Sequence, residues 1–333
     1  MSHSNISIFV PHVGCPHKCA FCDQRTITGE NEIPHAEDVR RICEQAIGQI
    51  SDPQDTEIAF FGGSFTAIPR SYMLELLEAA KPFVGDGGFK GIRCSTRPDC
   101  INSEILSLLK DYGITAIELG AQSLSDKVLG ANERGHSAED VENAAKLIRA
   151  FGIELGLQMM IGLYKSSIAD ERHTINSITE LSPDTVRIYP VVILENTRLA
   201  ELYRSGEYRT FDLDTVVDIA AYALLKFYDN GISVIKCGLH ASEFVERDMV
   251  GGFYHPAFRE LCEGRIYRSR IESALASAGI SSARGTLSFA VRKGCISKAV
   301  GHRRENIDHF ASRGLNIRFT ENDTLPLYTV KLQ

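Results

Sequence analysis

The sequence predicts an α/β protein, a partial (β/α)6-type barrel of parallel strands followed by a small α+β domain. Short apolar runs alternate with amphipathic stretches through about residue 240, which indicates parallel strands joined by helices and buried on both faces. Glycine, cysteine, serine and glutamine stand where these runs end, and chemistry gathers at strand ends in such barrels. The 333 residues are 44% hydrophobic and 24% charged, as in a globular protein with a large core.

Apolar runs give the predicted strands, which are 6–11, 57–63, 91–96, 116–123, 154–163 and 185–193. The stretches between them predict helices at about 36–50, 71–84, 102–112, 137–151 and 169–181. Ser137 supplies an N-terminal capping signal, and Gly113 and Gly152 stand near helix ends. A helix at about 212–230 and a strand at 233–239 extend this body.

The composition changes after "GGFYHPAF" at 251–258, whose glycines and proline suit a junction. We therefore expect a barrel domain over 1–250 and a small domain over 251–333. Residues 284–318 hold eight Lys or Arg and two acidic residues, although the whole chain has a net charge of −7. Such asymmetry indicates a basic module on an acidic body.

Targeting signals are missing from the sequence as given. It has no run of eighteen apolar residues, and residues 1–12 do not read as a signal peptide. We therefore expect a cytoplasmic protein without a membrane span. Nine cysteines, an odd number, argue against a disulfide framework in such a protein.

Three cysteines lie close together in "GCPHKCAFC" at 14–22. Cys15, Cys19 and Cys22 follow the first predicted strand, and their thiolates can converge on one metal centre. A structural zinc ion normally takes four protein ligands, whereas a cubane iron–sulfur cluster can use three and leave one iron open. The spacing favours the cluster. A zinc site completed by His17, or thiols without metal, stay open as alternatives.

The C-x3-C-x2-C spacing of "CPHKCAFC" resembles the signature of radical S-adenosylmethionine (SAM) enzymes. This resemblance implies a [4Fe-4S] cluster on the three cysteines and an open iron that binds SAM. It also implies an electron donor that reduces the cluster. The cofactors would then supply a 5′-deoxyadenosyl radical that abstracts hydrogen from a substrate.

The same resemblance implies a set of SAM contacts at the strand ends. Phe21 would lie against the adenine, and the backbone of Gly62 and Gly63 in "FFGGSF" would accept hydrogen bonds from the SAM ammonium. Ser64 follows where many members have glutamate. The remaining implied contacts are Ser95, Gln122 and Gln158, with Arg134 facing the SAM carboxylate.

Four stretches narrow the resemblance to the radical SAM domain of the Elongator catalytic subunit: "STRPD" (95–99), "ELGAQS", "NERGHSAEDV" (132–141) and "VRIYPVVILENTRLAELYRSGEY" (186–208). It covers roughly residues 5–240 and implies a radical SAM enzyme acting on tRNA or another RNA, and not on DNA. Arg187 and Tyr189 are the candidate catalytic residues for contacting substrate. We expect no acetyltransferase domain before Gln333. The cysteine spacing is closer to that of oxygen-independent coproporphyrinogen oxidases than to that of Elongator. An enzyme that acts on a small molecule is therefore an alternative.

The segment at about 286–320 reads as strand, short helix, tight loop, helix and strand. This order resembles a KH RNA-binding domain, in which a G-x-x-G loop clamps the nucleic-acid backbone. Arg304 replaces the second glycine here. The candidate RNA-binding residues are Lys298, His302, Arg303 and Arg304. The module is alternatively a solvated basic cap on the barrel. The whole protein is alternatively a non-catalytic RNA-binding protein with a structural metal.

Overall fold

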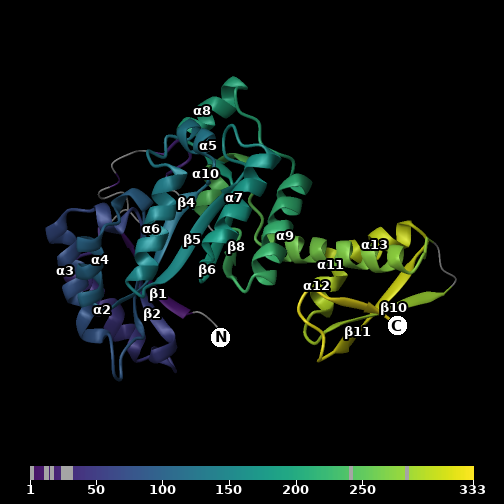
Figure 1. Ribbon diagram of the computed structural model, residues 1–333, viewed down its shortest axis with the longest axis horizontal. Coiled ribbons are helices and arrows are strands. Elements are labelled where there is room, and N and C mark those ends of the chain that lie inside the picture. Colours follow the sequence, from purple (N-terminus) through teal and green to yellow (C-terminus); the bar gives the residue numbers. More distant parts are fainter. Residues whose placement is uncertain (1–3, 11–14, 16–18, 24–32, 240–242, 282–284) are drawn as a thin grey trace. The chain divides into compact units, whose positions relative to one another are not determined.

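A computed structural model describes residues 4–10, 15, 19–23, 33–239, 243–281 and 285–333 (Figure 1). The chain forms two compact units. The first comprises residues 1–210, 232–236 and 240–253, and the second comprises 211–231, 237–239 and 254–333.

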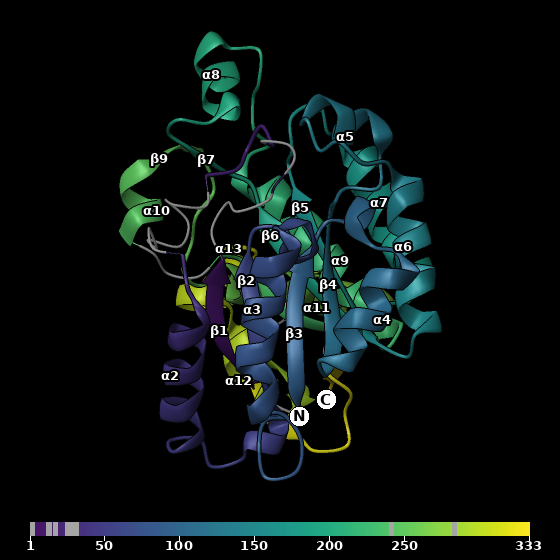
Figure 2. The same ribbon diagram turned by 90° about the vertical axis from the view of Figure 1, so that its left-hand side faces the viewer.

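A curled sheet of seven strands forms the centre of the first unit (Figure 2). Its order is β1 (Ser4–Val10), β2 (Thr56–Gly62), β3 (Gly91–Thr96), β4 (Ile114–Gln122), β5 (Glu154–Ile161), β6 (Thr185–Pro190) and β8 (Ser233–Cys237). Neighbouring strands from β1 to β6 pair in parallel. The predicted partial parallel barrel is confirmed, including the strand that extends it.

Helices pack on the outer face of this sheet (Figure 2). They are α2 (Ala36–Ile47), α3 (Arg70–Ala80), α4 (Ser103–Asp111), α6 (Ala138–Ala150) and α7 (Ile168–Leu181), close to the predicted ranges. Ser137 caps α6 by accepting a hydrogen bond from the Asp140 amide. The sequence prediction missed the short helices α5 (Asp126–Ala131), α8 (Arg198–Ser205) and α10 (Glu243–Asp248).

The predicted strand 185–193 is wrong as one element. It divides into β6 and β7 (Val192–Leu194), and β7 pairs antiparallel with β9 (Met249–Gly252) outside the barrel. Pro190 has no amide hydrogen to continue the strand ladder, so the chain can leave the sheet there. Short 3-10 turns connect other elements at Pro53–Asp55, Phe65–Ala67, Lys81–Phe83, Pro98–Cys100 and His302–Arg304.

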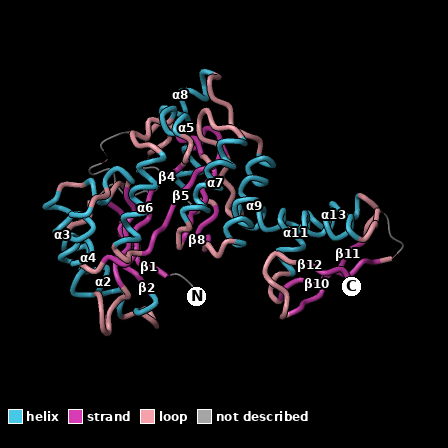
Figure 3. Tube along the Cα trace, viewed as in Figure 1, coloured by secondary structure: helices cyan, strands magenta, loops and turns pink. Residues whose placement is uncertain are grey.

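The second unit combines two long helices with a small mixed sheet (Figure 3). The helix α9 (Leu213–Asp229) contacts α11 (Phe258–Ser277), which the sequence prediction missed. The sheet order is β11 (Asn316–Asn322), β10 (Thr286–Arg292), β12 (Val330–Leu332), with α12 (Ile296–Val300) and α13 (Glu305–Ser312) between β10 and β11. The predicted order of strand, helix, turn, helix and strand is confirmed.

Alternation along the barrel strands separates an apolar face from a polar one. Ile117 and Leu119 on β4, like Val186 and Ile188 on β6, are fully buried in the core. Glu118 lies between the first pair, and polar residues from β3, β5 and β6 share its face. The polar inner face of the sheet is therefore where a site can form. In the ranges that the structure describes, no helix is long and apolar enough to cross a membrane.

Candidate active site

The cysteine turn is held by two distant segments of the first unit. The Cys22 amide donates to the Cys19 carbonyl at 3.1 Å, which closes the turn. The Ala20 amide donates to the Asn132 carbonyl at 3.1 Å, and the Ala20 carbonyl accepts from the Leu199 amide at 2.8 Å. Asn132 directly follows α5 and Leu199 is the second residue of α8, so these helices determine where the cysteines lie.

The thiols of the turn influence one another electrostatically. Burial, followed by the nearby Cys19 and Cys15, raises the pKa of Cys22 to about 12. All nine cysteines of the chain are free thiols. Among the described residues, no three His, Cys, Asp or Glu side chains are close enough to bind a metal ion. His17 lies outside the described residues, as do residues 11–14 and 16–18 of this loop.

Arg134 joins the turn to the end of β4. Its Nη1 donates to the Cys19 Sγ at 2.9 Å, and its Nη2 donates to the Gly120 carbonyl at 2.6 Å. Its guanidinium lies 5.9 Å from the centroid of the Phe21 ring. Arg134 is buried. Three predicted site residues, Cys19, Phe21 and Arg134, therefore lie together.

Two polar atoms beside this group lack partners within the protein. The Oε1 of Gln122 and the Nε of Arg134 are buried without a hydrogen bond in the described part of the chain. Gln122 adopts a φ of 65°, which is rare for a residue with a side chain. An unpartnered acceptor and donor at one place fit a ligand that carries both kinds of group. SAM, with its carboxylate and ribose hydroxyls, meets this requirement.

Gly62 ends β2 against the neighbouring strand. Its φ is 114°, and a Cβ at this position would lie 2.8 Å from the Val10 carbonyl oxygen. The Gly63 amide donates to that same oxygen at 2.9 Å. The hydroxyl of Ser64 bonds to the Thr96 Oγ1 at 2.9 Å and accepts from the Arg97 amide. The close packing of β2 against β1 thus explains why residue 62 is glycine. Ser64 joins the end of β2 to the end of β3 through its hydrogen bonds.

Glu118 is the centre of a hydrogen-bond cluster on the inner face of the sheet. Arg187 donates to it through Nε at 2.5 Å and Nη2 at 2.9 Å. Gln158 donates to it at 3.0 Å and lies 3.2 Å from the Ser95 hydroxyl. The predicted residues Gln158 and Arg187 therefore meet at a carboxylate that the sequence did not single out, and the predicted Ser95 adjoins it through Gln158. A lone acid in a strongly apolar strand is the signal that could have revealed it.

Arg93 supports Glu118 from one side. Its guanidinium is fully buried and contacts three carboxylates, Glu57 at 2.8 Å, Glu118 at 3.4 Å and Glu154 at 2.7 Å. Burial by itself would lower the pKa of Arg93, but these acids outweigh it and raise the pKa. Burial would likewise raise the pKa of Glu118, but Arg187 and Arg93 lower it. The two arginines therefore favour the ionised form of Glu118.

Tyr189 stands two residues beyond Arg187 on the same face of β6. Burial raises the pKa of Tyr189, and the neighbouring Arg187 partly offsets this effect. The Arg187 guanidinium lies 5.0 Å from the Phe61 ring centroid, so a stacked ring and a bidentate carboxylate fix its plane. A phenol hydroxyl and a fixed guanidinium can orient a polar substrate.

The four candidate RNA-binding residues divide into two pairs. The Lys298 ammonium lies 3.0 Å from the buried Glu263 carboxylate, and His302 lies 3.5 Å from Glu260. Arg303 and Arg304 are exposed in the turn before α13, with φ values of 48° and 68°. A glycine would adopt these angles without strain. The loop therefore keeps the conformation that its missing second glycine would favour.

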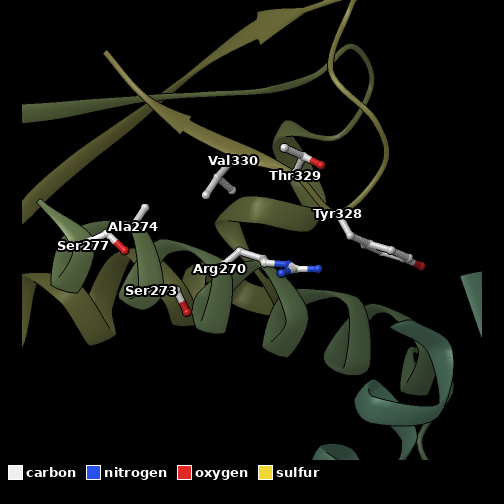
Figure 4. A pocket seen from close by; sticks show the side chains of 7 residues that line it. All are labelled: Arg270, Ser273, Ala274, Ser277, Tyr328, Thr329 and Val330. Atoms are coloured by element: carbon white, nitrogen blue, oxygen red, sulfur yellow. The ribbon is translucent and has the colours of Figure 1, made fainter. Parts of the chain in front are cut away.

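Two hollows elsewhere contain none of the predicted site residues. One, of about 310 Å³, lies between α11 and the segment before β12 in the second unit (Figure 4). Figure 4 shows Arg270, Ser273 and Ser277 along the helix and Thr329 above them. The other, of about 450 Å³, includes Lys90, Thr115 and Asp184.

Comparisons with known proteins show the family of the chain. Residues 9–178 match the family model of the Radical SAM superfamily, and residues 183–268 match that of the Radical_SAM C-terminal domain. The first match spans more than half of the chain. The chain belongs to the radical SAM superfamily, and a [4Fe-4S] cluster and SAM are its cofactors.

Curated relatives match between half and two thirds of the chain. A tRNA uridine(34) acetyltransferase from Methanocaldococcus infernus is 27% identical over 261 residues, which cover 66% of this chain and 48% of that protein. The corresponding protein from Dehalococcoides mccartyi is 26% identical over 250 residues, covering 65% and 54%. Human Elongator complex protein 3 is 26% identical over 188 residues, covering 50% and 34%. The chain spans about half the length of the acetyltransferases it matches.

Solved structures share the fold. The archaeal Elp3 of Methanocaldococcus infernus, lacking residues 1–46, superposes with a TM-score of 0.56 and 21% identity, covering 73% of this chain and 61% of that one. The coproporphyrinogen III oxidase of Escherichia coli superposes with a TM-score of 0.50 and 15% identity, covering 69% and 54%. Both likenesses concern the fold alone.

Proposed function

We propose that this radical SAM enzyme modifies RNA, with transfer RNA as its substrate class. The observation that carries the proposal is the similarity to tRNA uridine(34) acetyltransferases from two organisms over about two thirds of this chain. Membership of the radical SAM superfamily favours an enzyme over a non-catalytic RNA-binding protein. The small-molecule alternative is supported by the cysteine spacing and by a shared fold at 15% sequence identity.

The cofactors would be held at the carboxyl ends of the first strands. Cys15, Cys19 and Cys22 are the proposed cluster ligands. Gln122 and Arg134 offer SAM the acceptor and the donor that lack partners in the protein. When bound, the cluster, reduced by one electron from its donor, and SAM would supply radical chemistry that removes a hydrogen atom from the substrate, and SAM would leave as methionine and 5′-deoxyadenosine. Phe21 and the Gly62–Gly63 backbone complete the proposed SAM contacts.

Arg187 and Tyr189 are the proposed substrate contacts inside the barrel. Glu118 fixes two nitrogens of the Arg187 guanidinium, and the Phe61 ring lies 5.0 Å from it. A nucleobase offers carbonyl oxygens that both a guanidinium and a phenol hydroxyl can donate to. Gln158 acts in this proposal by holding Glu118, and through it Arg187, while the Ser95 hydroxyl accepts a hydrogen bond from Gln158.

Arg303 and Arg304 are the proposed phosphate contacts. Both side chains are exposed, and each guanidinium can form paired hydrogen bonds with a phosphate group. Lys298 is a weaker candidate, because its charge is already paired with Glu263. Such contacts would hold an RNA without reading its sequence.

The test uses the holoprotein, reconstituted with its cluster under anaerobic conditions. SAM and a reductant are added with bulk tRNA from cells that lack this protein, with coproporphyrinogen III, or with neither. We expect tRNA to increase 5′-deoxyadenosine formation and a nucleoside of changed mass to appear in the digested tRNA. The Cys19→Ala variant is the control. Stimulation by coproporphyrinogen III and not by tRNA would contradict the proposal.

A further inference from the structure

Arg134 contacts Cys19, which is a cluster ligand in the proposed function on which this inference rests. Its Nη1 lies 2.9 Å from the Cys19 Sγ, within hydrogen-bond distance, while its Nη2 donates to the Gly120 carbonyl at 2.6 Å. We infer that Arg134 is a positioning residue for the iron–sulfur cluster. Arg134 donates a charged hydrogen bond to the sulfur of Cys19 and thereby raises the reduction potential of the cluster.

The position of Arg134 is fixed from several sides. Its two guanidinium nitrogens are directed to different partners, which sets the plane of the group. Its own carbonyl accepts a hydrogen bond from Arg97 Nη2 at 2.6 Å. The neighbouring Asn132 carbonyl accepts from the Ala20 amide in the cysteine turn. Backbone and side chain therefore hold residues 132–134 and the turn as one assembly.

The charge of Arg134 is directed at the sulfur and not at an acid. The nearby Arg97 is balanced by Asp99, which accepts two hydrogen bonds from it at 2.9 Å. Within the described residues, no carboxylate forms an ion pair with Arg134. Arg134 is only 6% exposed, so little solvent screens its charge. Its effect on a negative ligand is correspondingly strong.

A cation at this place favours the reduced cluster. Reduction adds one electron, which makes the cluster and its thiolates more negative, and hydrogen bonds to the sulfurs are among the factors that set the potential. From the sequence, Arg134 is expected to face the SAM carboxylate. The geometry assigns Nη1 to Cys19 and leaves the unpartnered Nε as the donor for SAM. The two roles can therefore be separated.

The decisive measurement is the midpoint potential of the cluster without SAM, from a redox titration followed by electron paramagnetic resonance. For Arg134→Gln, we expect the ratio of reduced to oxidised cluster at a fixed potential to fall at least tenfold, a shift of about 59 mV for one electron. Arg209→Gln removes an exposed arginine of the same unit and should leave the midpoint unchanged.

An unchanged midpoint in Arg134→Gln without SAM, together with weaker SAM binding, would overturn the inference and leave Arg134 as a SAM contact only. If Arg134→Gln does not retain a cluster, Arg134→Lys takes its place. Lysine keeps the charge but lacks the fork that reaches both Cys19 and Gly120. We then expect a lower midpoint than in the parent, and an equal midpoint would overturn the inference.

Discussion

Glu118 and Arg187 form a bidentate ion pair across the barrel interior, with distances of 2.5 and 2.9 Å, although β5 separates their strands. The intervening strand allows this because Gly156 faces Glu118 in the pairing of β4 with β5. A Cβ on Gly156 would lie 2.8 Å from the Glu118 Cγ. The ion pair therefore depends on glycine at position 156 as well as on the charges of Glu118 and Arg187.

Glu118→Gln should destabilise the protein strongly. The change leaves Arg187 and Arg93 in the interior without the carboxylate that both contact, and breaking a buried ion pair typically costs about 3–5 kcal/mol. Urea unfolding measures this loss. Glu154→Gln is the matched control, because Glu154 contacts the same Arg93 but is 26% exposed, and we expect it to cost less.

A double-mutant cycle isolates the pair itself. Arg187→Gln should also be costly, whereas Glu118→Gln combined with Arg187→Gln should cost clearly less than the sum of the two single changes, because neither charge then loses its partner. Free energies of unfolding that add within error would contradict the structural coupling of these two residues.

Local sequence patterns predicted the barrel strands, the cysteine turn and the glycines at the end of β2. The strands are visible as continuous apolar runs, and the cysteines and glycines as short motifs, so both depend on neighbouring residues alone. Glu118 and Arg93 were not predicted, because their partners come from strands up to 69 residues away in sequence. Only the register of the sheet brings such residues together.

The C-terminal module illustrates the same limit. The charge of residues 284–318 was counted within the segment, yet Lys298 is neutralised by Glu263, which lies 35 residues earlier on α11. The helix α11 itself was missed because its buried face includes Glu263 and Gly264 among apolar residues, which interrupts the amphipathic pattern. Contacts between elements far apart in sequence therefore determine both the net charge near Lys298 and the residues that α11 buries.

Gly62→Ala should disturb the junction of β1 and β2. The new Cβ would lie 2.8 Å from the Val10 carbonyl oxygen, so the strand ends must shift in addition to adopting an unfavourable φ. Gly85→Ala is a closely matched control, since Gly85 has a φ of 108° but no atom within 4 Å of its added Cβ. We expect both variants to lose stability through the φ strain, roughly 1–3 kcal/mol, and Gly62→Ala to lose more. Equal melting temperatures would show that contact with Val10 is unimportant.

Glu171 should make the protein less stable as the pH rises. Burial raises its pKa to about 7, although the Gly162 amide and the Ser166 hydroxyl donate to its Oε1 at 2.8 and 2.7 Å. Between the pKa of the unfolded chain and about 7, the folded state binds a proton that the unfolded state has lost. The contribution of Glu171 to the free energy of unfolding is therefore complete at low pH, and it disappears as the pH rises through about 7.

Glu171→Gln tests this dependence because glutamine keeps the acceptor oxygen without the charge. At pH 8 the variant should be more stable than the parent by up to about 3 kcal/mol, and the difference should vanish near pH 4. The adjacent Asp170 provides a control of opposite sign, since its pKa is lowered by hydrogen bonds from Lys127, Ser167 and Ser125 that outweigh its burial. Asp170→Asn should lose stability at neutral pH. Urea unfolding between pH 4 and 8 measures both.

Arg303 and Arg304 should contribute to RNA binding through charge alone. Replacing both with alanine should weaken the binding of any tRNA to a similar degree, and should reduce the slope of log affinity against log salt by roughly one for each phosphate contact that is lost.

Lys298→Ala should instead lower the melting temperature, because it leaves the buried Glu263 with fewer donors. Arg304→Gly separates charge from fold, since glycine adopts the φ of 68° without strain and should keep or increase stability while still weakening the binding. Filter binding at several salt concentrations checks these expectations, and an unchanged slope in the double variant would remove both arginines from the RNA surface.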